Sequence, residues 1–288
     1  MADPKMFAET LHDGYAQHMR IDEVLFERRT EHQHMLIFRN NLFGRVMALD
    51  GIVQTTEADE FIYHEMLTHV PIFAHGHARE ILIIGGGDGG MLREACKHAT
   101  VERVTQVEID QAVVDMCVDH LPNHSSGAYD DPRLNLVIDD GAHFVESAAD
   151  RFDVIIIDST DPIGPGESLF TNAFHSACQR CLAPGGVLVT QNGVVFMQPS
   201  EAAGTARILQ SLYADWHFYV AAVPTYVGGN MTFGWGAQES SLREVDVALL
   251  SQRFAGAGII TRYYTPEVHK AAFALPQFVM ELVGKAKS

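Results

Sequence analysis

Carboxylate side chains follow four of the apolar runs that the sequence predicts as β-strands. They occur in the motifs IGGGDGG, VEID, IDDG and DSTDPIGPGES, and the acids are Asp88, Glu108, Asp139, Asp140, Asp158 and Asp161. Because parallel strands present their carboxyl ends at one edge of a sheet, we expect these acids to line one rim. Clustered carboxylates repel each other unless a ligand, a metal or a proton compensates their charge. The four motifs contain no Lys or Arg, so we expect the compensating charge on cationic ligands.

The run from Ile81 to Gly90 predicts a buried strand that enters a glycine-rich turn at the N-terminus of a helix. Gly85, Gly87 and Gly90 match the GxGxxG pattern of dinucleotide-binding turns. A dinucleotide would place its pyrophosphate on this turn, beside the carboxylate of Asp88. Asp88 therefore favours a nucleoside ligand without phosphates that carries positive charge, such as an S-adenosyl sulfonium compound. The structural alternative is that Asp88 only caps the helix, since Asp is a favoured cap residue.

The other acidic strand ends suit further parts of such a ligand. Glu108 lies about 20 residues after the glycines, where an acid that binds ribose hydroxyls is expected. Asp140 is placed to accept a hydrogen bond from an adenine amino group, while Gly141 lets the backbone approach. Asp158 and Asp161 stand three residues apart after the last of these strands. The expected ligands carry a sulfonium and one or two ammonium groups.

Composition narrows the classes of partner. The chain has 288 residues and a formal net charge of −17, which argues against nucleic acid and anionic membranes, because both need clustered Lys and Arg. The N-terminal residues lack the apolar run of a signal peptide, and no stretch approaches the length of a membrane span. Four cysteines predict a reducing, cytoplasmic location. Cys178 and Cys181 form a CxxC within a predicted helix and are expected to be buried thiols, and no metal site is predicted.

The sequence predicts two domains, at residues 1–71 and 72–288. Short β-like runs between residues 22 and 56 predict a small antiparallel β domain. A helix is expected over residues 58–70, ended by Pro71, because proline disrupts a helix interior. Residues 72–79 then form the expected linker into the larger domain.

Strands and helices alternate after the linker. The expected parallel strands after the glycine turn are at residues 104–109, 134–138, 154–157 and 187–191. Repeated βα units with apolar strands predict a doubly wound parallel sheet. A hairpin made of residues 218–223 and 231–235 is expected to add an antiparallel strand. The predicted fold is α/β, a Rossmann-like methyltransferase-type seven-stranded sheet with a small N-terminal antiparallel β domain. Beyond residue 242 we expect one amphipathic helix and a second short one near the end.

Several motifs, in this order along the chain, together resemble one enzyme family. They are VQTTEADEFIYHEM, IIGGGDGG, VEID, IDDG, DSTDPIGPGESLF and VPTYVGG. The sequence resembles the polyamine aminopropyltransferases, and specifically the bacterial spermidine synthases, over almost its whole length. The resemblance implies a cytoplasmic enzyme that moves an aminopropyl group from decarboxylated S-adenosylmethionine to putrescine, giving spermidine and 5′-methylthioadenosine. It also implies a homodimer or homotetramer, with the nucleoside as a co-substrate and no cofactor or metal.

The resemblance also implies roles for individual residues. Asp158 would be the general base on the attacking amine, in a direct in-line displacement. The residues implied to bind the diamine or polyamine are Gln54, Tyr63, His64, Asp88, Asp158, Ser159, Thr160, Asp161 and Tyr226. Those implied to bind the nucleoside are Gln33, Gly85, Gly87, Asp88, Glu108, Asp140, Gly141 and Pro165, with Asp88 on the aminopropyl ammonium. Family members often have Gln where this chain has His64. The Gly- and Pro-rich stretch at residues 162–169 is expected either to close over the substrates as a lid or to be a rigid connector.

Three other functions compete with this interpretation. A putrescine N-methyltransferase would use S-adenosylmethionine itself, whose carboxylate the acidic surroundings of Asp88 would repel. An NAD-dependent oxidoreductase is supported by GxGxxG but opposed by Asp88. A noncatalytic nucleoside-binding module would be expected to lack Asp158 or Asp161, and both are present. Within the aminopropyltransferases, cadaverine, agmatine or spermidine remain alternative acceptors.

Overall fold

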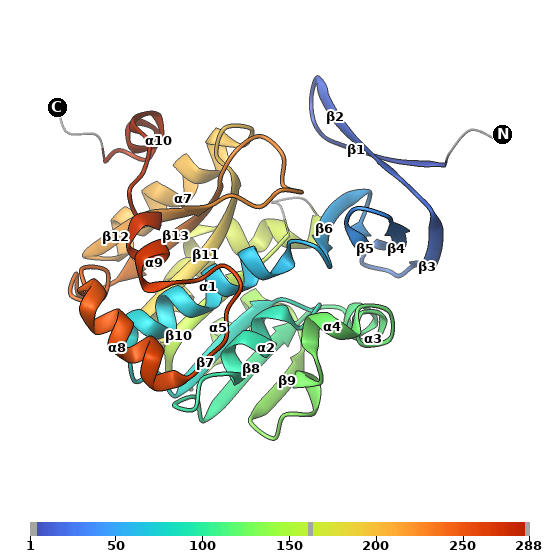
Figure 1. The fold of residues 1–288 in the computed structure, drawn as a ribbon. Helices are drawn as coiled ribbons and strands as arrows, with labels where there is room; N and C mark the ends of the chain where they lie inside the picture. Colours follow the sequence, from blue (N-terminus) through green and yellow to red (C-terminus); the bar gives the residue numbers. More distant parts are fainter. Residues whose placement is uncertain (1–4, 161–163, 286–288) are drawn as a thin grey trace.

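The computed structural model describes residues 5–160 and 164–285 and has two parts (Figure 1). The first part consists of the strands β1 (Met6–His12), β2 (Tyr15–Arg20), β3 (Glu23–Arg29), β4 (His34–Asn40), β5 (Gly44–Leu49) and β6 (Ile52–Thr56). The strands of the second part are β7 (Glu80–Gly85), β8 (Arg103–Glu108), β9 (Leu134–Ile138), β10 (Phe152–Asp158), β11 (Leu182–Val194), β12 (Asp215–Ala221) and β13 (Met231–Ala237). Its helices are α1 (Glu60–His75), α2 (Gly90–Cys96), α3 (Gln111–His120), α4 (Pro122–Ser125), α5 (Gly141–Ser147), α6 (Asn172–Cys181), α7 (Pro199–Leu212), α8 (Val247–Ala257), α9 (Pro266–Ala272) and α10 (Gln277–Leu282), with 3₁₀ turns η1 (Ala128–Asp130) and η2 (Gly164–Phe170).

The second part is built on one seven-stranded sheet in the order β12-β13-β11-β10-β7-β8-β9. The pairs from β11 through β10, β7 and β8 to β9 are all parallel, while β13 pairs antiparallel with both β11 and β12. The predicted α/β fold and its C-terminal hairpin are confirmed. The order reverses at β7, so the carboxyl ends of β7 and its neighbours open onto the crevice where ligands bind in such sheets.

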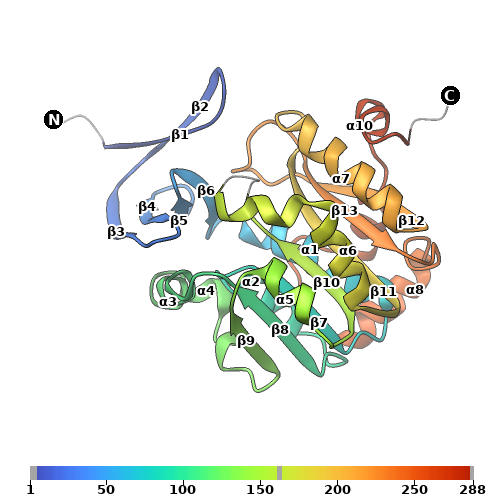
Figure 2. The same ribbon diagram turned by 180° about the vertical axis from the view of Figure 1, so that it is seen from behind.

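Helices cover both faces of the sheet (Figures 1 and 2). Alternate residues of β7 point to opposite faces, so Ile81 and Ile83 pack with α1, α2, α8 and α9. Leu82 and Ile84 pack on the other side with α5, α6, α7 and α10. These fully buried aliphatic strands have the continuous apolar pattern of a sheet covered on both faces. Among the described residues, no helix is both long and apolar enough to cross a membrane.

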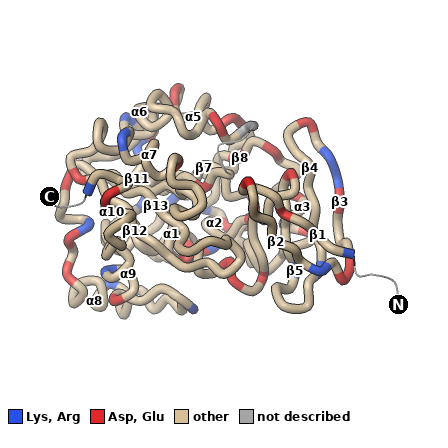
Figure 3. Tube along the Cα trace, turned by 90° about the horizontal axis from the view of Figure 1, so that it is seen from above, with Lys and Arg blue, Asp and Glu red and all other residues tan. Residues whose placement is uncertain are grey.

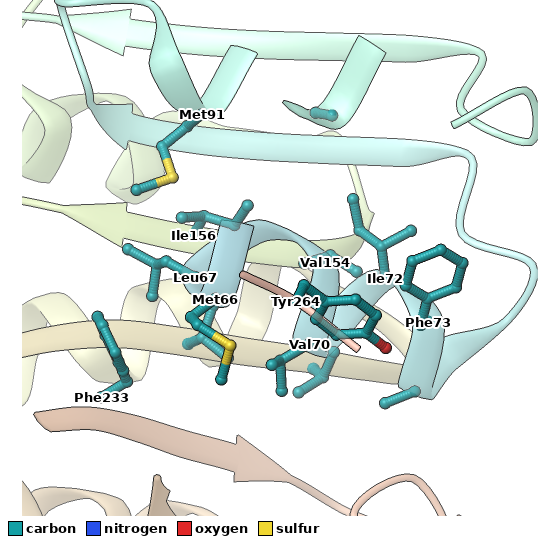
Figure 4. Close-up of a cluster of buried hydrophobic side chains, with 14 of the residues drawn as sticks. Met66, Leu67, Val70, Ile72, Phe73, Met91, Val154, Ile156, Phe233 and Tyr264 are labelled. Atoms are coloured by element: carbon teal, nitrogen blue, oxygen red, sulfur yellow. The ribbon is translucent and has the colours of Figure 1, made fainter. Parts of the chain in front are cut away.

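Helix α1 lies in the centre of one of these layers (Figure 4). Met66, Leu67 and Val70 are fully buried among strand residues such as Val154 and Ile156. The expected helix end at Pro71 is wrong, because α1 continues to His75 and ends at Gly76, whose φ of 82° suits glycine. An interior proline costs about 3 kcal/mol, but burial of Ile72 and Phe73 contributes about 1.5–3 kcal/mol each. The expected linker at residues 72–79 therefore begins only after His75.

The N-terminal part contains one hairpin that the sequence analysis missed. β3 to β6 form the expected four-stranded antiparallel meander, but β1 and β2, which precede it in the chain, pair as a separate two-stranded sheet. The signal was Asp13-Gly14, a turn dipeptide whose Gly14 has a φ of 76°. The meander packs its inner face, with Met35, Ile37 and Met47, against Val113 and Met116 of α3. The division at residues 71 and 72 stays a prediction.

The C-terminal segment has one more helix than expected. α8 and α10 correspond to the two predicted helices, and α9 lies between them. Its start carries a recognisable signal, since Thr265 accepts a hydrogen bond from Val268 N and Pro266 occupies the first helical turn. Glu65 of α1 holds the chain just before α9 by accepting bonds from the backbone N–H groups of residues 262, 263 and 264.

Asp59 connects the start of α1 to the loop between β12 and β13. Its carboxylate is 4% exposed and accepts bonds from the Thr56 hydroxyl and from both the backbone N–H and the hydroxyl of Thr225. In Asp59→Asn an amide NH₂ replaces one acceptor and leaves a buried donor unmatched, so we expect a loss of about 1–3 kcal/mol of unfolding free energy. Urea denaturation of this variant and of Asp115→Asn, an exposed carboxylate on α3, checks this; equal midpoints would contradict it.

Candidate active site

One cavity lies at the carboxyl ends of the sheet strands, between the two parts of the chain. The structure brings fourteen of the predicted site residues to its wall: Gln33, Gln54, Tyr63, His64, Gly85, Gly87, Asp88, Glu108, Asp140, Gly141, Asp158, Ser159, Thr160 and Tyr226. Asp161 lies outside the described residues, as does the side chain of Pro165. Of the stretch at residues 162–169, the described part forms η2, and Leu169 reaches the cavity. Whether this stretch closes over ligands stays a prediction.

The glycine turn after β7 presses directly against the end of β10. Gly85 has a φ of 86° and pairs with Asp158, and a Cβ at this position would overlap the carbonyl oxygen of Asp158. Gly86 and Gly89 also have positive φ, which fixes the turn in a shape that only glycine adopts readily. Gln106 donates from its amide to the Gly85 and Gly86 carbonyls and holds the turn in place.

Asp88 has two roles in this turn. Its Oδ1 accepts a hydrogen bond of 2.7 Å from Gly90 N at the first residue of α2. One oxygen of Asp88 therefore caps the helix, as the structural alternative expected. Its Oδ2 lies 3.2 Å from His64 Nε2, and His64 in turn lies 2.5 Å from Glu60 through Nδ1. Burial alone would raise the pKa of Asp88, but His64 holds it well below its usual range. The expectation that cationic ligands supply the compensating charge stays a prediction, and α1 brings a second candidate for that charge, His64, to Asp88.

Asp158 ends β10 and faces the cavity next to Tyr63 of α1. The Tyr63 hydroxyl donates a bond of 2.6 Å to Asp158 Oδ1. Loss of solvent and the nearby charge of Asp88 raise the pKa of Asp158 to about 6. The carboxylate is thus oriented by one neighbour and made more basic than an exposed aspartate.

Glu108 and Asp140 lie at the next two strand ends. Glu108 is 7% exposed, and burial raises its pKa to about 7. One of its oxygens accepts from Asp110 N, and the other lies where a Cβ on Gly87 would come within 2.8 Å. Asp140 accepts a hydrogen bond from Ala142 N at the start of α5. A side chain at Gly141 would overlap Ile84, so only glycine fits at this position.

The N-terminal part and the β12-β13 loop supply the opposite wall. The Tyr226 hydroxyl donates to the Gln54 carbonyl, and the Tyr226 ring lies 5.8 Å from that of Tyr63 in an edge-on arrangement. Gln33 follows β3 in a turn held by Thr30, whose hydroxyl also donates to Asp110 in the second part of the chain. These contacts cross between residues far apart in the sequence and enclose the cavity.

Gln191, which was not among the predicted site residues, lies on β11 at the same rim. Its amide donates to the carbonyls of Ser159 and Thr160 at 2.8 and 3.3 Å, and its oxygen accepts from Gly193 N. It therefore fixes the backbone that follows Asp158. The rule that selected the acidic strand ends also points to Gln191, but an uncharged amide at a strand end carries a weaker signal than a carboxylate.

Acidic and basic residues are distributed over the whole trace, with no continuous basic stripe along the described chain (Figure 3). The cavity wall includes Asp88, Glu108, Asp140 and Asp158, whereas none of its described lining residues is Lys or Arg. Among the described residues, no group of three or more His, Cys, Asp and Glu is arranged to hold a metal ion. An acidic cavity of this kind favours ligands with positive charge.

Family models match both parts of the chain. Residues 60–247 match the model described as "Spermine/spermidine synthase domain", and residues 6–57 match "Spermidine synthase tetramerisation domain". The chain belongs to the spermine/spermidine synthase family. Its relatives include the polyamine aminopropyltransferase of Pseudomonas syringae pv. tomato, 64% identical over 98% of this chain and 99% of that protein, and that of Pectobacterium carotovorum, 56% identical over the full length of both.

Solved spermidine synthases share the whole fold. A spermidine synthase crystallised with the transition state analogue AdoDATO superposes with a TM-score of 0.93 at 36% identity, covering 99% of this chain and 97% of that one. The spermidine synthase of Thermotoga maritima gives a TM-score of 0.90 at 34% identity, over 99% and 96% of the two chains. The predicted family and fold are thus confirmed, while the roles of the individual site residues stay predictions.

The contact between Gly85 and Asp158 leads to a test with a matched control. In Gly85→Ala the new methyl group meets the Asp158 backbone, so β7 and β10 must separate and displace Asp158. Gly51 has a similar φ of 82°, and a methyl group added there would meet nothing within 4 Å, so Gly51→Ala carries only the backbone strain of about 1–2 kcal/mol. We expect Gly85→Ala to lower the melting temperature more than Gly51→Ala does. We also expect Gly85→Ala, unlike Gly51→Ala, to lose most of its activity. Comparable thermal and kinetic profiles for the two variants would contradict the contact.

Proposed function

We propose that this protein is a spermidine synthase, which transfers the aminopropyl group of decarboxylated S-adenosylmethionine to putrescine. The products are spermidine and 5′-methylthioadenosine. The observation that carries the proposal is the placement of Asp88 and Asp158 on the wall of one acidic cavity, with Glu108 beside the glycine turn. High identity to named polyamine aminopropyltransferases over the full chain supports the same conclusion.

Asp158 acts as the general base in the proposed mechanism. An alkyl amine has a pKa of about 10.4 and is protonated at pH 7, so it must lose a proton before it can attack. With one oxygen held by Tyr63, Asp158 accepts that proton on its carboxylate. The amine nitrogen then bonds to the methylene carbon beside the sulfonium as the carbon–sulfur bond breaks, and the sulfonium becomes a neutral thioether. Orientation of the three atoms in line is the main contribution of the site.

The cavity wall divides between the two substrates. In the proposal, Gln33, Gly85, Gly87, Glu108, Asp140, Gly141 and Pro165 hold the nucleoside, with Asp88 on its aminopropyl ammonium. Gln54, Tyr63, His64, Ser159, Thr160, Asp161 and Tyr226 hold the diamine. The edge-on pair of Tyr63 and Tyr226 offers aromatic faces to a diamine cation. The acceptor is taken to be putrescine, and other polyamines are outcomes of the assay below.

Assembly and location are proposed on the same basis. The match of residues 6–57 to a tetramerisation domain supports a homotetramer, or a homodimer, formed through the N-terminal strands. The hairpin of β1 and β2 leaves Met6 and Tyr15 each 45% exposed, which suits a surface that pairs with a second copy. A cytoplasmic location stays a prediction from the sequence.

The first test is a product assay by mass spectrometry with putrescine and either decarboxylated or intact S-adenosylmethionine. We expect spermidine and methylthioadenosine from the decarboxylated donor alone. Asp158→Asn removes the base and should lower the turnover by about 100-fold or more, whereas Asp150→Asn, an exposed carboxylate, serves as the control. N-methylputrescine as product would instead make the protein a methyltransferase. An Asp158→Asn variant with full activity would exclude this residue as the base.

The raised pKa of Asp158 also predicts a pH dependence. The base form is present above the pKa of about 6 and is lost as the carboxyl is protonated below it. We expect kcat/KM, which reports the pKa values of the free enzyme, to fall about tenfold per pH unit below pH 6. Glu108→Gln should keep this acidic limb, because Glu108 does not take the proton. A wild-type rate that stays level through the acidic range, well below this pKa, would show that no group of this kind acts as the base.

A further inference from the structure

A row of side chains with alternating charge runs from the cavity into the protein. It begins at Asp88, continues through His64 and Glu60, and reaches Arg93 on α2, whose guanidinium donates to Glu60 at 2.8 Å. Glu60 and His64 are one helical turn apart on α1, so their side chains lie on the same face. His64 is 2% exposed, and a Cβ on Gly90 would overlap its ring. The imidazole is therefore fixed between two carboxylates.

This arrangement favours the imidazolium form of His64. Burial alone would lower the pKa of His64, but the carboxylates of Asp88 and Glu60 raise it to about 10. The other groups that face the ring are His124 of α4, at a centroid distance of 6.1 Å, and Tyr63, at 5.7 Å. Burial lowers the pKa of His124, so it stays neutral beside His64. Asp158 adds a further carboxylate across the cavity.

The imidazolium poses a problem for the substrate. The following step rests on the proposed function, in which Asp88 receives the aminopropyl ammonium of the donor. That ammonium approaches the same Oδ2 that His64 Nε2 already faces at 3.2 Å. Two cations in one partly dry site repel each other, and both would compete for the same carboxylate oxygen, Oδ2 of Asp88.

We propose that binding of the donor exchanges a proton for the ammonium at Asp88, and that Glu60 is the positioning residue which makes this exchange productive. The N–H bond at His64 Nε2 breaks, its proton passes to solvent, and the ligand ammonium keeps all its protons. His64 retains its other proton on Nδ1, where it donates to Glu60. Nε2 then presents a lone pair to the ammonium, so His64, which also borders the proposed diamine side of the cavity, accepts together with Asp88 from the donor's ammonium.

Glu60 decides which nitrogen keeps the proton. Its Oε2 faces Nδ1 at 2.5 Å, and Arg93 holds the same oxygen from the other side. Burial alone would raise the pKa of Glu60, but His64 and Arg93 lower it, so the carboxylate stays ionised. An ionised Glu60 can only accept, and it lies 2.5 Å from Nδ1, whereas Asp88 lies 3.2 Å from Nε2, so the neutral ring keeps its hydrogen on Nδ1. The other tautomer would point a donor at the incoming ammonium.

Calorimetry counts the proton directly. Decarboxylated S-adenosylmethionine is titrated into the full-length protein without diamine at pH 8, in two buffers that differ in ionisation enthalpy. At this pH Asp158 and Glu108 are mostly ionised, so we expect a release close to one proton per donor bound. Methylthioadenosine has the same ribose and base but no ammonium, and should release almost none. Equal proton counts for the two ligands would overturn the exchange.

Two variants separate the exchange from a structural role. His64→Gln cannot titrate but still offers a carbonyl to the ammonium, so it should bind the donor without proton release. Glu60→Gln should release less than half as many protons and raise the KM for the donor by about tenfold, with a smaller change in kcat. Glu102→Gln, on an exposed carboxylate that faces Arg79, is the matched control. Release that persists in His64→Gln, or a Glu60→Gln variant that changes only the melting temperature, would overturn the proposal.

These experiments distinguish a failure of the proposed function from a failure of the proposed proton exchange. If the wild-type protein releases the proton on donor binding but forms no spermidine with putrescine, the exchange stands and the acceptor is wrong. If spermidine forms normally and the proton count is zero, the function stands and the exchange is excluded. If the donor neither binds nor reacts, both the proposed function and the proton exchange are excluded.

Discussion

The close contact between the glycine turn and the end of β10 is the constraint on which the site depends. β7 and β10 pair in parallel register through Gly85 and Asp158, and no side chain fits between them. The turn therefore cannot move away from the strand end, and Asp88 and Asp158 share one cavity at a fixed separation. Their mutual repulsion helps to raise the pKa of Asp158, which makes its carboxylate more basic than an exposed aspartate. A backbone contact thus determines the chemistry of two side chains.

Helix α1 contributes the partners of both carboxylates. Tyr63 donates to Asp158, while the next residue, His64, faces Asp88 from an adjacent position on the helix. The same helix holds the segment before α9 through Glu65, and Asp59 at its start holds the loop that carries Tyr226. Its central apolar residues are fully buried against the sheet, which fixes the whole helix as a rigid element. This explains why α1 tolerates an interior proline, because its packing on both sides of Pro71 is worth more than one backbone hydrogen bond.

The N-terminal strands complete the cavity rather than standing apart from it. Their inner face packs on α3, and Gln33 and Gln54 reach the wall from that side. Hydrogen bonds such as that from Thr30 to Asp110 and the contact between Thr55 and His124 join the parts at the level of single side chains. The cavity is therefore enclosed by residues from both parts of the chain.

The sequence by itself determined the sheet, its strands and the acidic rim. Those features are local: apolar runs of strand length, glycines before a helix and carboxylates at strand ends follow from a few neighbouring residues. It also pointed to Tyr63, His64 and Tyr226, although only through a family resemblance. The length of α1 past Pro71 was not recovered, because it depends on burial of Ile72 and Phe73 against residues distant in the chain. The hairpin of β1 and β2 and the contacts of Gln191 had only weak local signals, a single turn dipeptide and an uncharged amide at a strand end.

Only the tertiary structure decided how the charges pair. In the sequence, the glycine turn around Asp88 contains no Lys or Arg, and His64 is 24 residues away on another helix. Packing of α1 against α2 brings the two within 3.2 Å, places Glu60 and Arg93 behind the imidazole, and sets its protonation. Electrostatic interactions act through space and depend on burial, so the order of residues along the chain does not contain them. That is the physical reason why the acids could be identified in advance and their charge states could not.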